Sequence, residues 1–360
     1  MWVMKTARVL LAIMLFLFAI ASAAACTDFQ VKANDGAVII ARSMEFGLDL
    51  QSRLSVHPRG EARSSAAPSG KPGVRWTSKY GFVSANAVGL DIVIDGMNER
   101  GLAVEFLWLP DSTKYQNVSA GQENRAIDIL DTGAWMLGTL STVAEVKAAM
   151  KDVLVWGKSM PQIQGIPTLH IAVHDAAGNN AVIEFVDGQQ KIYDNPNSVL
   201  TNEPTFDWQI INLRNYINLR AFGSGPVDVR GFVLQPTGQG TGLLGIPGDW
   251  TPPSRFVRAS TMLDFAMPAG TALQGVNLAQ HVLNAVDIPK GTTRASQKDK
   301  GTGDYTQWII VKDLKNKMLY FRSYDNLVLR ALDLKKIDFT PKAKARSIPI
   351  NGGIGFIDVT

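Results

Sequence analysis

The sequence predicts an α+β fold, in which antiparallel sheets and helices form separate layers. Strand-like runs occupy both ends of the chain, and most helix-like stretches lie between them, which is the order expected for an α+β sandwich. The chain has 360 residues, 46% of them hydrophobic, so it can bury a large core. No internal repeat or interdomain linker is visible, and residues 26–360 are therefore expected to form a single domain.

Strands are expected where short apolar or β-branched runs are bounded by turn residues. Residues 26–32 are predicted to be a strand, Asn34-Asp35-Gly36 a turn, and residues 37–46 the returning strand of a hairpin. The other predicted strands share this pattern and cover residues 81–85, 91–94, 103–107, 169–173, 181–186, 191–193, 308–311, 318–322 and 327–333.

Helices are expected at residues 124–137, 143–153, 206–219, 256–265 and 276–285. The second of these opens with Thr142-Val-Ala-Glu145, which has the sequence of a capping box. The stretch 223–253 is rich in Gly and Pro and is expected to be a loop that borders the substrate pocket.

The first 25 residues have the layout of a signal peptide. Lys5 and Arg8 give a positive start, residues 9–21 are an unbroken apolar run, and Ser22-Ala-Ala-Ala25 supplies the small residues of a cleavage site. The apolar run is shorter than the roughly 20 residues that a membrane span needs. The sequence therefore predicts a cleaved leader and an exported, periplasmic chain without stable membrane insertion.

The charge balance gives little reason to expect a nucleic-acid partner. The predicted leader holds two of the 36 Lys and Arg residues and none of the 32 Asp and Glu residues, so 34 basic residues face 32 acidic ones after cleavage. A net charge of +2, spread along the chain, is not the footprint of nucleic-acid binding.

No metal or cofactor site is predicted. One cysteine excludes a disulfide framework and multi-cysteine metal centres. His170 and His174 fall in a strand-like run, where four residues span about 13 Å, so the two histidines should not share a metal. Gly240-Thr-Gly242-Leu-Leu-Gly245 matches G-x-G-x-x-G, but no clear strand leads into it, and dinucleotide binding is not expected.

Cleavage after Ala25 would make Cys26 the first residue of the mature chain. An N-terminal cysteine carries its own base, because its α-amino group has an ordinary pKa of about 7.7–8.0 and can take the thiol proton. Two other interpretations stay open at this point. The residue could be a buried structural cysteine, or a lipid anchor of the kind that follows lipoprotein signal peptides.

The predicted hairpin gives Cys26 charged neighbours. A tight turn centred on Asp35-Gly36 would place Cys26 opposite Glu45, with Arg42 close by. The carboxylate could then position the α-amine, and the guanidinium could favour the ionised sulfur. The alternative is an ordinary cross-strand charge pair at a sheet edge.

The mature sequence resembles the choloylglycine hydrolases, the bile salt hydrolases and penicillin V acylases of the N-terminal-nucleophile superfamily. Each motif that carries the resemblance is modest alone, but they follow one another in the family's order after Cys26-Thr. They are Ala41-Arg42-Ser43-Met44-Glu45-Phe46, Asp95-Gly-Met-Asn98-Glu-Arg-Gly101, Val199-Leu-Thr-Asn202-Glu-Pro204-Thr-Phe-Asp-Trp208, Ser254-Arg255-Phe-Val-Arg258, Thr306-Gln307-Trp308 and Tyr320-Phe-Arg-Ser-Tyr-Asp-Asn326. The resemblance implies the four-layer αββα sandwich of that superfamily and hydrolysis of a linear amide.

The same resemblance implies roles for particular residues. Cys26 matches the nucleophile and, through its amine, the base, while Arg42 matches the arginine against the thiol. Asn202 matches the side-chain donor of the oxyanion hole, and Arg255 matches a second active-site arginine.

Two further positions bear on the activity. Trp108 matches the position whose backbone N–H is the other oxyanion donor, and its ring offers an apolar wall for an aromatic or acyl group. Glu45 departs from the family, which usually has Asp there, and this puts the details of amine positioning in doubt.

Several functional alternatives follow. The interpretation we favour is a penicillin V acylase-like or N-acyl homoserine lactone acylase-like enzyme that acts on a small-molecule amide, and the alternative within the family is a conjugated bile salt hydrolase. From another class, a lipid-anchored, non-catalytic binding protein could use Cys26 as its anchor. Related enzymes are often homotetramers, so the resemblance allows that assembly here.

Overall fold

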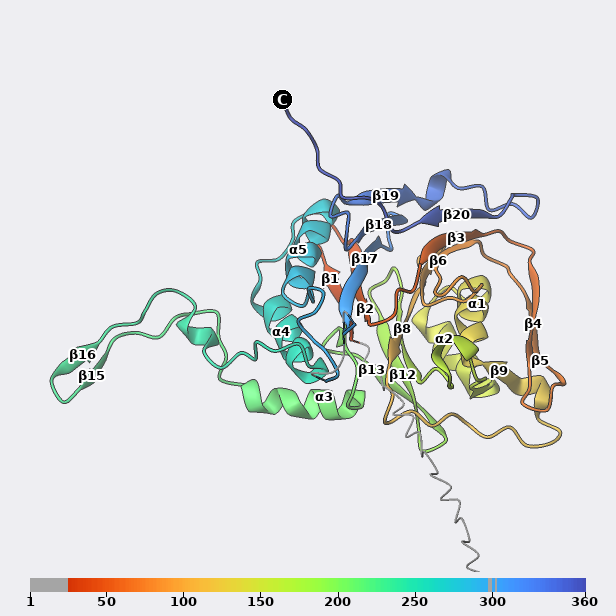
Figure 1. The fold of residues 1–360 in the computed structure, drawn as a ribbon, viewed down its shortest axis with the longest axis horizontal. Coiled ribbons are helices and arrows are strands. Elements are labelled where there is room, and N and C mark those ends of the chain that lie inside the picture. The colour runs from red at the N-terminus through yellow and green to blue at the C-terminus, as the bar shows by residue number, and fades with distance from the viewer. Residues whose placement is uncertain (1–24, 297–299, 302) are drawn as a thin grey trace, which may run out of the picture.

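The computed structural model describes residues 25–296, 300, 301 and 303–360, which form two large antiparallel sheets packed face to face (Figure 1). The first sheet has the strand order β14-β1-β2-β17-β18-β19. Its strands are β1 (Cys26–Lys32), β2 (Val38–Phe46), β14 (Val199–Leu200), β17 (Tyr305–Asp313), β18 (Met318–Ser323) and β19 (Arg330–Asp333). Strands from both ends of the chain are therefore neighbours in this sheet, and the predicted hairpin of β1 and β2 is confirmed.

The second sheet has the order β13-β12-β11-β8-β7-β6-β3-β20. Its strands are β3 (Arg53–His57), β6 (Phe82–Ala85), β7 (Asp95–Asn98), β8 (Ala103–Trp108), β11 (Leu169–His174), β12 (Asn180–Val186), β13 (Gln189–Asp194) and β20 (Arg346–Pro349). β3 and β20 were not among the predicted strands. β3 alternates polar and apolar residues but has only two apolar side chains, and β20 has a single aliphatic one, so each gives a weak signal.

Helices cover the outer face of each sheet and complete an αββα sandwich, as predicted (Figure 1). α4 (Pro252–Phe265) and α5 (Ala272–Asn284) lie on the first sheet, while α1 (Ile129–Thr139) and α2 (Val143–Ala149) lie on the second. One apolar core joins both sheets to α4 and α5, and another joins the second sheet to α1 and α2.

Smaller elements surround the sandwich. α3 (Phe206–Asn212) follows β14, and three two-stranded pairings lie outside the main sheets. These pairings are β4 (Ala62–Ala66) with β5 (Pro72–Thr77), β9 (Ala126–Asp128) with β10 (Leu154–Trp156), and β15 (Val227–Val229) with β16 (Phe232–Leu234). None of the helices formed by the described residues combines the length and the hydrophobicity needed to span a bilayer.

The register of the first hairpin differs from the prediction. Cys26 lies opposite Met44, not Glu45, and Lys32 lies opposite Val38. The connection is a three-residue loop rather than a two-residue turn, and Gly36 adopts the left-handed conformation that such a loop needs (φ 79°). Because strand side chains alternate between faces, this shift of one residue moves Glu45 to the face opposite the thiol.

The predicted strand at residues 91–94 is wrong, because the ladder begins only at Asp95, the first residue of β7. The apolar side chains of Ile92 and Ile94 instead line a pocket. The helix predicted at 124–137 begins later, at Ile129, where the Asp128 side chain accepts from the Leu130 N–H and caps the first turn.

The stretch 223–253 is not a loop beside the pocket, as the sequence had led us to expect. It contains the β15–β16 hairpin, which projects far from the sandwich (Figure 1). We call residues 223–245 the β15–β16 arm. None of the described residues that line the pocket next to Cys26 belongs to it.

Candidate active site

Cys26 begins β1 and is buried between the two sheets, with 2% of its surface exposed. Its side chain shares a face with those of Met44 and Arg42, the face that packs on the second sheet. The sulfur lies 3.8 Å from Met44 Sδ and 3.6 Å from Arg42 Nη2. The thiol is therefore held between a soft thioether and a fixed cation.

Arg42 is fully buried, so its contacts rather than water determine where its charge lies. The guanidinium donates to the carbonyl oxygens of Ile94, just before β7, and of Phe106 in β8, and Nη1 lies 3.8 Å from Asp95 Oδ2. Burial opposes the charge, but the thiol and Asp95 outweigh it and hold the pKa of Arg42 above its ordinary value. Arg42 thus stays cationic against the sulfur.

Asn202 and Arg255 bond to backbone atoms of Cys26. The Cys26 N–H donates to Asn202 Oδ1 at 2.6 Å, and Arg255 Nη2 donates to the same oxygen at 2.9 Å. Arg255 Nη1 donates to the Cys26 carbonyl at 2.5 Å and to Thr27 Oγ1 at 2.7 Å. Arg255, on α4, therefore fixes both the backbone of the candidate nucleophile and the orientation of the Asn202 amide.

The other predicted oxyanion donor lies close to Asn202. Asn202 Nδ2 donates to the Trp108 carbonyl at 2.7 Å. An amide nitrogen has two hydrogens, so this bond orients the group and leaves one N–H for another acceptor. Along β8, Phe106 donates to Ile94 and Leu109 donates to Thr168 on the other side. Because N–H directions alternate in a strand, the Trp108 N–H points to the side of β7, just past its end.

An apolar pocket opens onto Cys26 and encloses about 590 Å³, including its open mouth. Trp108 forms part of its wall and meets Phe46 edge to face, with ring centroids 5.9 Å apart. The other lining side chains are Met44, Leu50, Ala87, Val88, Ile92, Ile94, Phe106, Leu130, Met160, Ile163, Pro167 and Leu169. Among the described lining residues, only the Cys26 thiol and the Trp108 indole carry a side-chain hydrogen-bond donor.

Glu45 does not contact Cys26 in the way the sequence predicted. It is fully buried on the helix-facing side of β2, where it accepts from Thr306 Oγ1 at 2.8 Å. Burial raises its pKa from 4.5 to about 7, although the charge of Arg255 opposes this rise. Glu45 therefore interacts with the site only through the charge of Arg255, which bonds to the Cys26 backbone and to Asn202.

The raised pKa of Glu45 predicts a pH-dependent stability. Between pH 4.5 and about 7 the folded chain keeps a proton that the unfolded chain has lost, so this group lowers the free energy of unfolding as pH rises through that window. Glu45→Gln does not titrate. Urea unfolding at a series of pH values should show its stability relative to wild type growing by up to about 3 kcal/mol across the window.

Glu123→Gln provides the control for that experiment. Backbone N–H groups and Lys71 lower the pKa of Glu123, so the relative stability of its variant should fall as pH rises towards 4.5 and stay level between pH 4.5 and about 7. A stability difference between Glu45→Gln and wild type that does not vary with pH would contradict the prediction.

Three residues between the sheets have the donor atoms of a metal site. Oxygen and nitrogen atoms of Asp28, Glu105 and His174 lie within 4.8 Å of one another, and all three residues are buried. However, Lys312 Nζ already lies 2.5 Å from Glu105 Oε1. An ammonium in contact with one of the three groups favours an ion-pair network over a cation site.

The site also contains residues that sequence reasoning did not select. Thr27 accepts from Arg255, and Met44 contacts the thiol. Both residues belong to the motifs around Cys26 and Arg42. The register of the hairpin alone would therefore have predicted that they lie near Cys26. The residues of the pocket wall could not be predicted from the sequence, because they come from separate strands and loops of the chain.

The chain also matches a known protein family and several of its characterised members. A model described as linear amide C–N hydrolases, choloylglycine hydrolase family, matches residues 26–345. The chain is 31% identical over 318 residues to a bile salt hydrolase/transferase of Clostridium perfringens, covering 86% of this chain and 93% of that protein. It is 30% identical over 341 residues to a penicillin V acylase of Pectobacterium atrosepticum, covering 88% of this chain and 83% of that protein.

Solved structures give the same result. A variant of the conjugated bile acid hydrolase from Clostridium perfringens superposes with a TM-score of 0.81 at 28% identity, covering 93% of this chain and all of that one. The penicillin V acylase from Agrobacterium tumefaciens superposes with a TM-score of 0.74 at 27% identity, covering 91% of this chain and 93% of that one.

Proposed function

The chain belongs to the choloylglycine hydrolase family of linear amide C–N hydrolases, and from this premise we propose that Cys26, freed by removal of residues 1–25, is its nucleophile. The observation that carries the proposal is the convergence on Cys26 of Arg42 at the sulfur and of Asn202 at the nitrogen, beside an apolar pocket. The leader itself, residues 1–24, lies outside the described residues. The match of the family model from residue 26 supports cleavage there and a single catalytic domain over residues 26–360.

The proposed reaction uses the α-amine as base and acid. The amine takes the thiol proton, and the thiolate, held beside Arg42, attacks the amide carbonyl. The second N–H of Asn202 and the Trp108 N–H stabilise the resulting oxyanion. Collapse of this intermediate breaks the C–N bond, and the α-ammonium gives its proton to the departing nitrogen. Water then hydrolyses the thioester and restores the thiol.

The acyl group of the substrate is proposed to occupy the apolar pocket. A phenoxyacetyl or fatty acyl group offers only apolar surface and, at most, an ether oxygen. The hydroxyl groups of a bile acid would lose hydrogen bonds to water in such a lining and find few partners. The pocket therefore supports penicillin V acylase-like or N-acyl homoserine lactone acylase-like activity over bile salt hydrolysis.

A panel of substrates tests this choice. We expect the mature protein to hydrolyse phenoxymethylpenicillin or an N-acyl homoserine lactone with a kcat/KM at least about tenfold above that for glycocholate, since each lost hydrogen bond in the pocket costs about 1–3 kcal/mol. A preference for glycocholate would establish the bile salt alternative. If protein with a free N-terminal cysteine hydrolyses none of them, the proposal about the substrate fails.

The intact mass of the mature protein distinguishes the proposed enzyme from the lipid-anchored binding protein. A diacylglyceryl group on the Cys26 sulfur would block the thiol and add its own mass, and the chain would then fractionate with membranes. We propose instead that the exported chain carries a free Cys26 and works in the periplasm, and a mass equal to residues 26–360 in a periplasmic extract would support that location.

We also propose that the chain forms a homotetramer through the β15–β16 arm. The arm exposes Val227, Phe232 and Leu234 by 55%, 68% and 49%, and apolar side chains on a projecting hairpin favour contact with another copy.

Light scattering during gel filtration should therefore give four chains for wild type and fewer for Phe232→Glu. Arg230→Ala, in the turn of the same hairpin, is the control and should leave the tetramer intact. A monomeric wild-type protein would contradict the proposal.

A further inference from the structure

Six charged or titratable side chains form a connected group between the two sheets, and every one of them is fully buried. We call them the inter-sheet charge network. Its members come from the inner faces of six strands and are Asp28 (β1), Arg42 (β2), Asp95 (β7), Glu105 (β8), His174 (β11) and Lys312 (β17).

The network runs without interruption from the active site into the core. Arg42 links the Cys26 sulfur to Asp95. Lys312 Nζ lies 2.7 Å from Asp95 Oδ2 and 2.5 Å from Glu105 Oε1, so it bridges the two carboxylates. Each neighbour in this chain is an ion-pair partner of the next.

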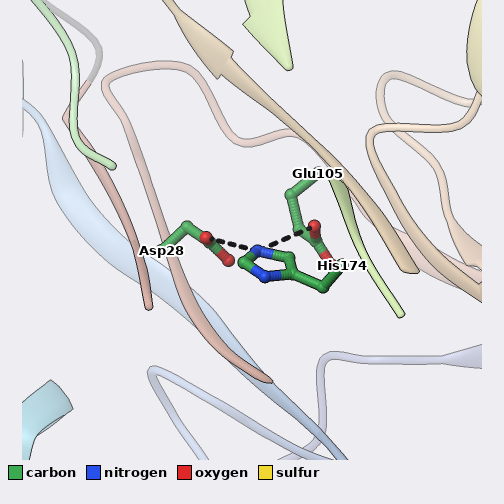
Figure 2. Close-up of side chains that lie close together, drawn as sticks. All are labelled: Asp28, Glu105 and His174. Atoms are coloured by element: carbon green, nitrogen blue, oxygen red, sulfur yellow. Dashed lines mark hydrogen bonds and ion pairs between the residues drawn. The ribbon is translucent and has the colours of Figure 1, made fainter. Parts of the chain in front are cut away.

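His174 closes the far end of the network. Figure 2 shows its imidazole between Asp28 and Glu105, with one ring nitrogen directed at both carboxylates. Nε2 lies 2.9 Å from Asp28 Oδ2 and 3.7 Å from Glu105 Oε2. The ring therefore joins the strand that begins with Cys26 to the second sheet.

The number of charges calls for one further proton. Arg42 and Lys312 supply two cations, whereas Asp28, Asp95 and Glu105 supply three carboxylates. Buried charge without compensation is strongly unfavourable, and one proton on the imidazole would bring the network to neutrality. A divalent cation at the same place would leave a surplus positive charge, so the network is better completed by a proton than by a metal.

The electrostatic environment agrees with this assignment. Burial disfavours the imidazolium, but the charge of Asp28 and its hydrogen bond, together with Glu105, raise the pKa of His174 above its ordinary value. Burial also raises the pKa of Glu105 to about 7, against the effect of Lys312. The network therefore retains a proton near neutral pH. Nε2–H can donate to Asp28 in either charge state of the ring, and the added proton of the imidazolium would lie on Nδ1, which has no hydrogen-bond partner among the described residues. The two carboxylates beside Nε2 favour the ring as the place of that proton through their charge.

We propose that His174, as an imidazolium, is a positioning residue that keeps Arg42 against the Cys26 sulfur. Without its charge, Asp28 and Glu105 would draw Lys312 away from Asp95. Asp95 would then attract Arg42, its other cationic neighbour, away from the thiol. The inference rests on the proposed role of Cys26. It adds a residue outside the substrate pocket that determines how closely Arg42 lies to the sulfur.

The single cysteine makes a direct test available. Alkylation of the mature protein by iodoacetamide reports only on Cys26 and requires no substrate. In His174→Gln, which keeps a donor but loses the charge, we expect the midpoint of the alkylation rate against pH to move up by about one unit. In the double variant Asp28→Asn/His174→Gln, which restores the charge balance, the midpoint should return to the wild-type value.

His57→Gln is the matched control, since His57 is a buried histidine in the second sheet that bonds to Ser84 and lies outside the network. It should leave the alkylation profile unchanged. An unshifted midpoint in His174→Gln, or the same shift in the single and double variants, would overturn the proposal whether or not the enzyme is active.

A second measurement does not depend on the variants folding. With four histidines in the chain, imidazole ¹⁵N resonances of the wild-type protein can be assigned individually. We expect His174 to give the imidazolium pattern at neutral pH. A neutral ring, or a stoichiometric metal in elemental analysis of the purified protein, would rule the proposal out.

Discussion

Cys26→Ala in the mature chain is expected to lower kcat/KM by at least about a thousandfold while the fold persists, because the variant removes the only nucleophile of the proposed reaction. The side chain is small and its sulfur contacts Met44 and Arg42 without filling a large volume, so the substitution should leave thermal unfolding close to that of wild type. The measurement is steady-state hydrolysis of the best substrate in the panel, with a circular dichroism melt on the same samples.

Met44→Leu gives a matched comparison, since it changes the other sulfur at 3.8 Å and keeps the nucleophile. We expect it to retain activity within about tenfold, because the thioether only packs against the thiol. Substantial turnover by Cys26→Ala would show that the nucleophile lies elsewhere, and an equal loss in both variants would indicate that packing, rather than chemistry, had been disturbed.

Asn202→Asp is expected to lower kcat by about a hundredfold to a thousandfold. The new carboxylate keeps the oxygen that accepts from the Cys26 nitrogen and from Arg255, so these two contacts survive, whereas the bond from Nδ2 to the Trp108 carbonyl is lost. It loses the amide N–H that would stabilise the oxyanion and places a negative charge where that oxyanion develops. The loss should therefore appear in kcat, with a smaller effect on KM.

Asn197→Asp is the control for this substitution. Asn197 donates to Ser260 Oγ at 2.6 Å in the same part of the chain, away from the pocket lining. Its variant should keep the wild-type kcat. If Asn202→Asp raised KM alone, Asn202 would bind the substrate in its ground state and the oxyanion role would be refuted.

The order of the motifs and the position of Cys26 were readable from the sequence because both are local. Hydrophobic periodicity gave most strands of the sandwich, and the αββα architecture and family that the resemblance implied are confirmed. Local patterns also misplaced some boundaries. The spacing of apolar residues indicated a helix from residue 124, but α1 begins at Ile129, after its N-cap Asp128. Ile92 and Ile94 line the pocket instead of forming a strand.

In the β1–β2 hairpin, a one-residue difference in loop length made the predicted pairing wrong. A loop of three residues instead of two reverses the face of every residue on the returning strand. It places Met44 and Arg42 beside the thiol and sends Glu45 to the helix side, although all three residues are near one another in the sequence. The predicted pairing of Glu45 with Cys26 was therefore wrong, whereas Arg42 lies at the thiol.

The sequence by itself determined which residues could do chemistry: one cysteine after a predicted leader, two arginines and an asparagine in recognisable motifs. Only the tertiary structure decided which of them meet. Asn202 is 176 residues from Cys26 yet lies 2.6 Å from its nitrogen, and the charges of six strands meet between the sheets. The physical reason is that backbone pairing and side-chain alternation are local, while burial and charge neutrality are satisfied only when both sheets pack together.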